Sequence, residues 1–138
     1  DCEAAGAHSI TVHLRADRRH MQDRDIFELK DSIAGYLNFE MGNTEEILGI
    51  ALQVKPDFAC MVPENREEVT TEGGLDVAGQ KEALSRAVDQ LQANGALVSM
   101  FIDPDEDRCQ NGGASYRGLR QLDGYRTGTR GDPTEECR

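Results

Sequence analysis

The chain lacks tryptophan, contains few other aromatic residues and carries much less positive than negative charge. Its 15 Lys and Arg residues against 26 Asp and Glu residues give a formal net charge of -11 at pH 7. Because this field repels phosphate backbones and anionic headgroups, general binding to nucleic acid or to a membrane surface is not expected. The sequence also lacks a bilayer-spanning apolar run and a recognisable signal peptide, so we expect a cytoplasmic protein.

Cysteine is scarce and poorly placed for a metal site or a disulfide framework. The four cysteines, Cys2, Cys60, Cys109 and Cys137, form no Cys-x-x-Cys pair, and no histidine lies beside them at zinc-ligand spacing. A metal site is therefore not expected. Cys60 lies in an apolar run, where a free cysteine behaves as a small buried hydrophobic residue.

Short apolar segments alternate with amphipathic helical segments through most of the chain. Alternating or wholly apolar patterns predict strands, and apolar residues at helical spacing predict helices between them. The expected strands are residues 9–14, 36–41, 57–63 and 96–102, and the expected helices are residues 23–33, 43–54 and 79–94. Strands joined through helices predict a parallel sheet with right-handed crossovers in a single domain.

Residues 9–20 concentrate the groups best suited to chemistry. Polar and apolar residues alternate in the first half, so His13 and Arg15 are expected on one face at the carboxyl end of a strand. Two more arginines and His20 follow in a loop. Histidine can accept a proton near neutral pH, and arginine binds phosphate or carboxylate through forked hydrogen bonds. The alternative is an amphipathic edge strand followed by a solvated basic turn.

Polar side chains recur at the carboxyl ends of the expected strands, where parallel sheets bind their ligands. Besides His13 and Arg15, they are Glu40, Glu64 and Asp103. One such residue carries little weight, but several that converge on one edge indicate the rim of an active site.

From Arg108 onward the sequence is rich in Gly and Arg, contains no Lys, and shows neither an apolar strand nor a helical stripe. We therefore expect a folded domain over residues 1–107 and little order over residues 108–138. A shifted reading frame or a truncation near Arg108 is our hypothesis for this abrupt change in composition.

Four stretches give the chain a specific resemblance to a known family, because several long motifs occur in order and at matching spacings. They are residues 10–20 (ITVHLRADRRH), 38–41 (NFEM), 55–58 (KPDF) and 62–77 (VPENREEVTTEGGLDV). Together they resemble pyridoxine 5'-phosphate synthase. The resemblance implies an α/β fold, a (β/α)8 TIM barrel, that condenses 1-deoxy-D-xylulose 5-phosphate with 3-amino-2-oxopropyl phosphate. The products it implies are pyridoxine 5'-phosphate, inorganic phosphate and water, with no metal or organic cofactor and with a homo-oligomeric assembly.

The resemblance also implies roles for five residues of this chain. His13 matches a proton acceptor of the family, and Glu40 matches a second acid/base group. Arg15, His20 and Thr70 match residues that bind the deoxyxylulose phosphate. Each role has a structural alternative: Glu40 can pair with Arg15, Thr70 can cap a turn, and His20 can be a solvated loop residue.

The chain carries only part of the family's pattern. The family's first strand and its later strands, with their phosphate-binding glycines, have no counterpart, which leaves about four of eight βα units. We therefore expect a partial barrel with exposed sheet edges, marginal stability, a tendency to associate and no synthase activity from the chain alone. Two other functions stay open: another phosphosugar enzyme on a barrel, and a non-catalytic interaction protein that uses the sheet edge or the tail.

Overall fold

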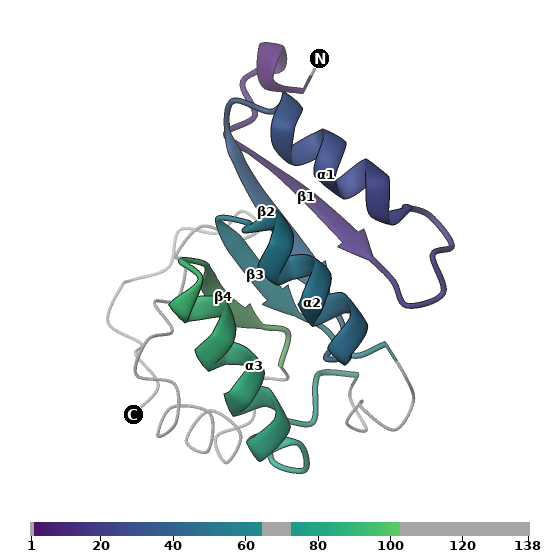
Figure 1. The fold of residues 1–138 in the computed structure, drawn as a ribbon, viewed down its shortest axis with the longest axis vertical. Coiled ribbons are helices and arrows are strands. Elements are labelled where there is room, and N and C mark those ends of the chain that lie inside the picture. The colour runs from purple at the N-terminus through teal and green to yellow at the C-terminus, as the bar shows by residue number, and fades with distance from the viewer. Residues whose placement is uncertain (1, 65–72, 103–138) are drawn as a thin grey trace, which may run out of the picture.

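The structure, a computed structural model, describes residues 2–64 and 73–102 (Figure 1). A short 3-10 helix at Glu3–Ala5 precedes an alternation of strands and helices. The elements are β1 (Ser9–Leu14), α1 (Asp23–Ser32), β2 (Tyr36–Met41), α2 (Glu45–Val54), β3 (Phe58–Met61), α3 (Lys81–Ala93) and β4 (Leu97–Met100). Every strand and helix predicted within the described ranges is therefore present, and the predicted tail and Asp103 lie outside those ranges.

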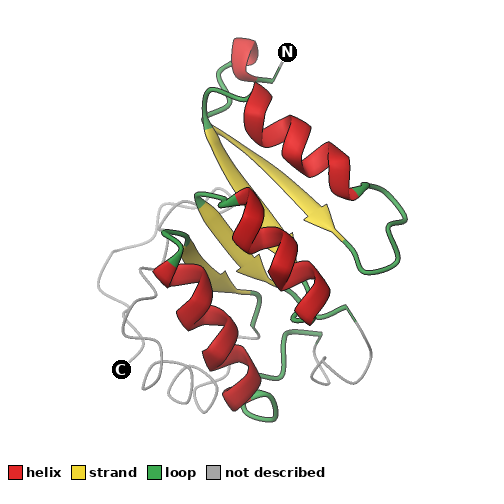
Figure 2. Ribbon diagram, in the orientation of Figure 1, coloured by secondary structure: helices red, strands yellow, loops and turns green. Residues whose placement is uncertain are grey.

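The strands form one parallel sheet whose order, β1-β2-β3-β4, follows the chain. Each crossover runs through a helix, and the three helices cover the same face of the sheet (Figures 1 and 2). Consecutive strand order with helices on one side is the winding of a (β/α) barrel, whereas a doubly wound sheet reverses its order and carries helices on both faces. The predicted partial TIM barrel is confirmed.

The hydrophobic core lies between the sheet and its helices. Alternation places Leu14, Phe39 and Met61 on the helix-facing side, and all three are fully buried or nearly so. The helices contribute their apolar stripes to the same cluster, with Ile26, Ile47, Ala51, Leu84, Val88 and Leu91. Removing water from these side chains is the main stabilisation of the described fold, at roughly 1.5–3 kcal/mol for each large aliphatic or aromatic group.

The other face of the sheet carries polar and aromatic side chains. The strand register aligns His13, Glu40, Cys60 and Ser99 in one row across the four strands. In a closed barrel this face is the interior. Within residues 2–64 and 73–102 no helix covers it, and Leu97 is 41% exposed.

At the end of the sheet where the strands begin, two carboxylates join neighbouring segments through hydrogen bonds. One oxygen of Asp57 accepts hydrogen bonds from Lys30 Nζ at 2.8 Å and from the Leu37 backbone N–H at 2.9 Å. Partial burial is the largest single influence on the pKa of Asp57 and acts to raise it. The hydrogen bonds and the positive charge of Lys30 together outweigh burial and hold that pKa below its ordinary value. Glu3 similarly accepts from the backbone N–H groups of Ala34 and Gly35. These contacts tie α1, β2 and β3 together away from the carboxyl ends.

Both later strands are shorter than predicted. We expected residues 57–63, but β3 ends at Met61 because Pro63 has no N–H to donate to a ladder, and Asp57 turns its side chain to α1. The backbone still pairs one step past the strand, since Val62 donates to the Met41 carbonyl. Among the described residues, none of the helices has the length and apolar character required to cross a bilayer.

Candidate active site

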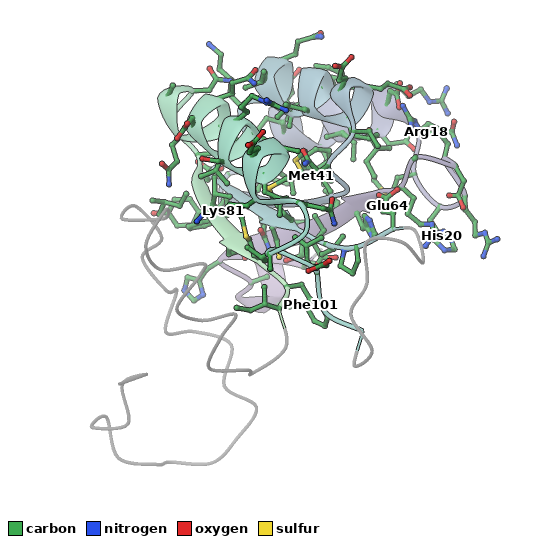
Figure 3. All side chains as sticks on the ribbon, turned by 90° about the horizontal axis from the view of Figure 1, so that it is seen from below. Arg18, His20, Met41, Glu64, Lys81 and Phe101 are labelled. Carbon is green, nitrogen blue, oxygen red and sulfur yellow. The ribbon has the colours of Figure 1, made fainter. Side chains whose placement is uncertain are left out.

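The carboxyl ends of β1, β2 and β3 bring three polar residues to one edge of the sheet. His13 and Glu40 are direct register partners on β1 and β2, and both lie on the uncovered face. Glu64 follows β3 by three residues. Figure 3 looks onto this edge and shows Glu64 beside the loop that carries Arg18 and His20. The convergence predicted from the sequence is therefore present for these three strands.

Glu64 binds three segments of the chain through one carboxylate. Its Oε1 lies 3.1 Å from His13 Nε2 and 3.2 Å from the backbone N of Gly42, while its Oε2 lies 2.9 Å from the backbone N of Ala16. The Glu64 side chain is only 6% exposed, and the His13 side chain is 28% exposed. The carboxylate thus contacts the Nε2 edge of the imidazole while the ring keeps access to solvent.

Gly42 makes room for this carboxylate. A Cβ atom at position 42 would lie 2.8 Å from Glu64 Cδ, closer than non-bonded carbons approach. Any other residue there would displace the carboxylate or the loop after β2. The glycine therefore permits the close approach of the Glu64 side chain to the backbone.

Arg15 forms a forked ion pair with Asp17. Arg15 Nε lies 3.1 Å from one carboxylate oxygen of Asp17, and Nη2 lies 2.9 Å from the other. The hydrogen bond with Asp17 raises the pKa of Arg15, and the same bond lowers the pKa of Asp17. The alternative in which Arg15 pairs with Glu40 is not what the structure shows. The guanidinium is one-third exposed and already holds an anionic group in the forked geometry that a phosphate would use.

Arg18 ties the loop after β1 to two helices. Its guanidinium pairs with Asp23 at the start of α1 and with Glu46 in the first turn of α2. The hydrogen bond that Arg18 donates to Asp23 is the main reason that the pKa of Arg18 is raised. Arg18 also takes a left-handed backbone conformation, with φ of 51°. This arginine is structural.

The remaining candidate residues are His20 and Thr70. His20 is exposed in the loop after β1, and Thr70 lies outside the described residues. Cys60 on β3 is the register partner of Glu40 on β2. Burial raises the pKa of the Cys60 thiol, although the hydrogen bond with Ser99 acts to lower it. Within the described ranges, no group of three His, Cys, Asp or Glu side chains is arranged to hold a metal ion.

Comparison with known proteins gives the family. The family model described as "Pyridoxal phosphate biosynthesis protein PdxJ" matches residues 1–117. The chain belongs to this family. Pyridoxine 5'-phosphate synthase of Synechococcus sp. (strain CC9605) is 56% identical over 117 residues, which cover 83% of this chain and 47% of that protein. The proteins of the same name from Synechococcus sp. (strain JA-2-3B'a(2-13)) and Colwellia psychrerythraea (strain 34H / ATCC BAA-681) are 61% and 59% identical, each over 75% of this chain.

The chain spans less than half the length of these PdxJ relatives, 42% to 47%. The four strands and three helices that the structure describes are accordingly a part of the PdxJ barrel, and the uncovered sheet face is the side that a complete barrel encloses. Functional groups of such barrels lie at the carboxyl ends of the strands. His13, Glu40 and Glu64 occupy that position here.

Sequence reasoning placed Glu64 on the rim but gave it no role. Its side chain reaches β1 and the loops after β1 and β2, and 51 residues separate it from His13. The available signal was a glutamate directly after the Pro63 that ends a buried strand, together with a glycine directly after β2. Neither residue alone predicts a contact between distant strands.

Proposed function

We propose that this chain supplies an acid/base pair and an anion-binding group of a pyridoxine 5'-phosphate synthase. The reaction proposed is the condensation of 1-deoxy-D-xylulose 5-phosphate with 3-amino-2-oxopropyl phosphate to pyridoxine 5'-phosphate, phosphate and water. The observation that carries the proposal is the pairing of His13 with Glu40 in register at the carboxyl ends of β1 and β2. Family membership and the names of the relatives support the same reaction.

Ring closure between a ketose phosphate and an aminoketone phosphate requires protons to leave carbon and water to leave the ring. His13 is proposed as the proton acceptor, since imidazole exchanges protons near neutral pH. Glu40 is proposed as the second acid/base group. Their position on neighbouring strands lets the two groups face one substrate from the same side of the sheet.

Substrate phosphate is proposed to bind at the loop after β1. Arg15 is the proposed forked donor, and His20 and Thr70 are proposed to complete the deoxyxylulose phosphate site. Arg15 already donates two hydrogen bonds to the Asp17 carboxylate. A phosphate dianion offers the same pair of acceptor oxygens with more charge, so it can replace Asp17 without moving the guanidinium far.

The test uses a chimera, because the chain covers less than half of its relatives. Residues 2–102 would replace the matching segment of the Synechococcus sp. (strain JA-2-3B'a(2-13)) protein, and pyridoxine 5'-phosphate formation would be measured by chromatography. We expect turnover, with a loss of about 10²- to 10⁴-fold in kcat for His13→Gln and for Glu40→Gln. Glu28→Gln, on the exposed surface of α1, is the matched control and leaves kcat unchanged.

Two outcomes would contradict the proposal. One is a folded chimera without turnover. The other is a His13→Gln variant that is as active as its parent. A chimera that uses other phosphosugars as readily as 1-deoxy-D-xylulose 5-phosphate would favour a different phosphosugar enzyme on the same barrel.

A further inference from the structure

We propose that Glu64 is a positioning residue for His13. Its carboxylate holds the imidazole with the proton on Nε2 and so presents Nδ1 as the proton-accepting nitrogen. The use of His13 as a base rests on the proposed function, but the state of the ring does not. It can therefore be measured without any enzymatic assay.

The backbone fixes the Glu64 carboxylate independently of His13. The N–H groups of Ala16 and Gly42 can only donate, and each points at a carboxylate oxygen, at 2.9 Å and 3.2 Å. They come from the loops after β1 and β2, so the two strand ends hold the carboxylate from two directions. With a side chain that is 6% exposed and a glycine against Cδ, the group has little space to turn.

The fixed carboxylate selects the tautomer of His13. An ionised carboxylate accepts hydrogen bonds and donates none, so the ring nitrogen that faces it must carry a proton. That nitrogen is Nε2, 3.1 Å from Oε1. In a neutral imidazole the second nitrogen then has a free lone pair. Glu64 thus determines which nitrogen can take a proton from a substrate, and it fixes the orientation of the ring.

This arrangement separates two tasks between two glutamates. Glu40 lies on the sheet face beside His13, where a substrate in the barrel interior would meet it. Glu64 approaches from the loop after β3 and contacts the ring at Nε2. The first is suited to exchange protons with a substrate, and the second to orient the imidazole, as carboxylates do for histidines in many active sites.

The first test is NMR of the complete 138-residue chain above neutral pH, where imidazole is largely uncharged. The three histidines, His8, His13 and His20, are labelled with ¹⁵N, and His13→Gln identifies the His13 signals. We expect a detectable N–H signal from His13 Nε2, because the contact with Glu64 slows exchange of this proton with water. We expect no such ring N–H signal from the exposed His8 and His20. A proton on His13 Nδ1, or no protected ring proton, would overturn the proposal.

Glu64→Ala supplies the second test. We expect the Nε2–H signal to disappear and the ¹⁵N pattern of His13 to approach that of His8 and His20. Glu45→Ala is the matched control, because Glu45 is an exposed carboxylate in the first turn of α2 at the same end of the sheet. A His13 pattern unchanged by Glu64→Ala would overturn the proposal, and the first test covers the case in which that variant fails to fold.

Activity separates this inference from the proposed function. In the chimera, Glu64→Ala should lower kcat by about 10- to 100-fold, as expected when a partner that orients an active-site imidazole is lost. KM for 1-deoxy-D-xylulose 5-phosphate should change little, because Arg15 and its loop are untouched. If the Nε2–H signal is present but His13→Gln leaves kcat unchanged, the proposed function fails and the positioning of His13 stands.

Discussion

Replacing Asp57 should weaken the fold by an amount that follows from its two hydrogen bonds. Lys30 and Asp57 are 29% and 34% exposed, so their ion pair contributes no more than about 0.5–1 kcal/mol. The Leu37 N–H donates to a charged oxygen, which contributes about 1.5 kcal/mol. We therefore expect Asp57→Ala to lower the free energy of unfolding by about 2–2.5 kcal/mol, and Asp57→Asn by about 1 kcal/mol, because the amide oxygen still accepts from Leu37.

The dependence on pH tests the electrostatic part of this argument. The pKa of Asp57 is below its ordinary value in the folded chain, so the charged carboxylate stabilises the fold above the unfolded pKa of about 3.9. That contribution is lost as the pH falls through the lower, folded pKa. Asparagine does not titrate, so the difference between wild type and Asp57→Asn should close under acid conditions.

Urea denaturation followed by circular dichroism measures the free energy of unfolding of wild type and of both variants. The measurement is made at neutral pH and again well below the unfolded pKa. Asp31→Asn is the control, because Asp31 is an exposed aspartate on the same helix that supplies Lys30. Equal stability of wild type and both Asp57 variants at neutral pH would refute the reasoning. So would a difference between wild type and Asp57→Asn that is the same at both pH values.

Three further predictions concern the site, the thiol and the sheet edges. Gly42→Ala should push the Glu64 carboxylate from its place and remove the protected His13 ring proton in NMR; a spectrum like that of wild type would contradict the close approach of 2.8 Å. Burial raises the pKa of Cys60, so a timed pulse of iodoacetamide, mapped by mass spectrometry, should label Cys60 more slowly than the exposed Cys2, and equal rates would refute this. Among the described strands, β1 and β4 each pair on one side only, so the chain should associate and its urea midpoint should rise with protein concentration. A sharp, concentration-independent transition of a monomer would contradict that last expectation.

The fold followed from local patterns because each element carries its own signal. Alternation around Val12 and Phe39 predicted β1 and β2 to the residue, and apolar spacing predicted α2, which begins two residues later than expected because Thr44 is its N-cap. The parallel direction of the strands followed from the helical crossovers, whereas the barrel, with its consecutive strand order, followed from the resemblance to the family. The ends of β3 and β4 were predicted too far along the chain, since apolar character continues past the point where pairing stops.

The contacts of the site were harder to predict, because they depend on how loops run after the strands end. The sequence showed that His13, Glu40 and Glu64 would gather at one edge, but not which carboxylate would contact the imidazole. The structural alternative paired Arg15 with Glu40, yet Asp17, two residues away, reaches Arg15 with less loss of chain entropy. In the sequence, Arg18 was as good a candidate for anion binding as Arg15. Only the structure shows that the Arg18 guanidinium forms ion pairs with Asp23 and Glu46.

The two ends of the sheet use carboxylates in the same way but for different purposes. At the end where the strands begin, Asp57 and Glu3 accept hydrogen bonds from backbone N–H groups, and Asp57 also accepts one from a lysine. At the carboxyl ends, Glu64 also accepts from two backbone N–H groups, but its third partner is an imidazole. A group that only had to join β1 to β2 would need no titratable partner. The presence of His13 in this network therefore favours a site that moves protons over one that only holds strands together.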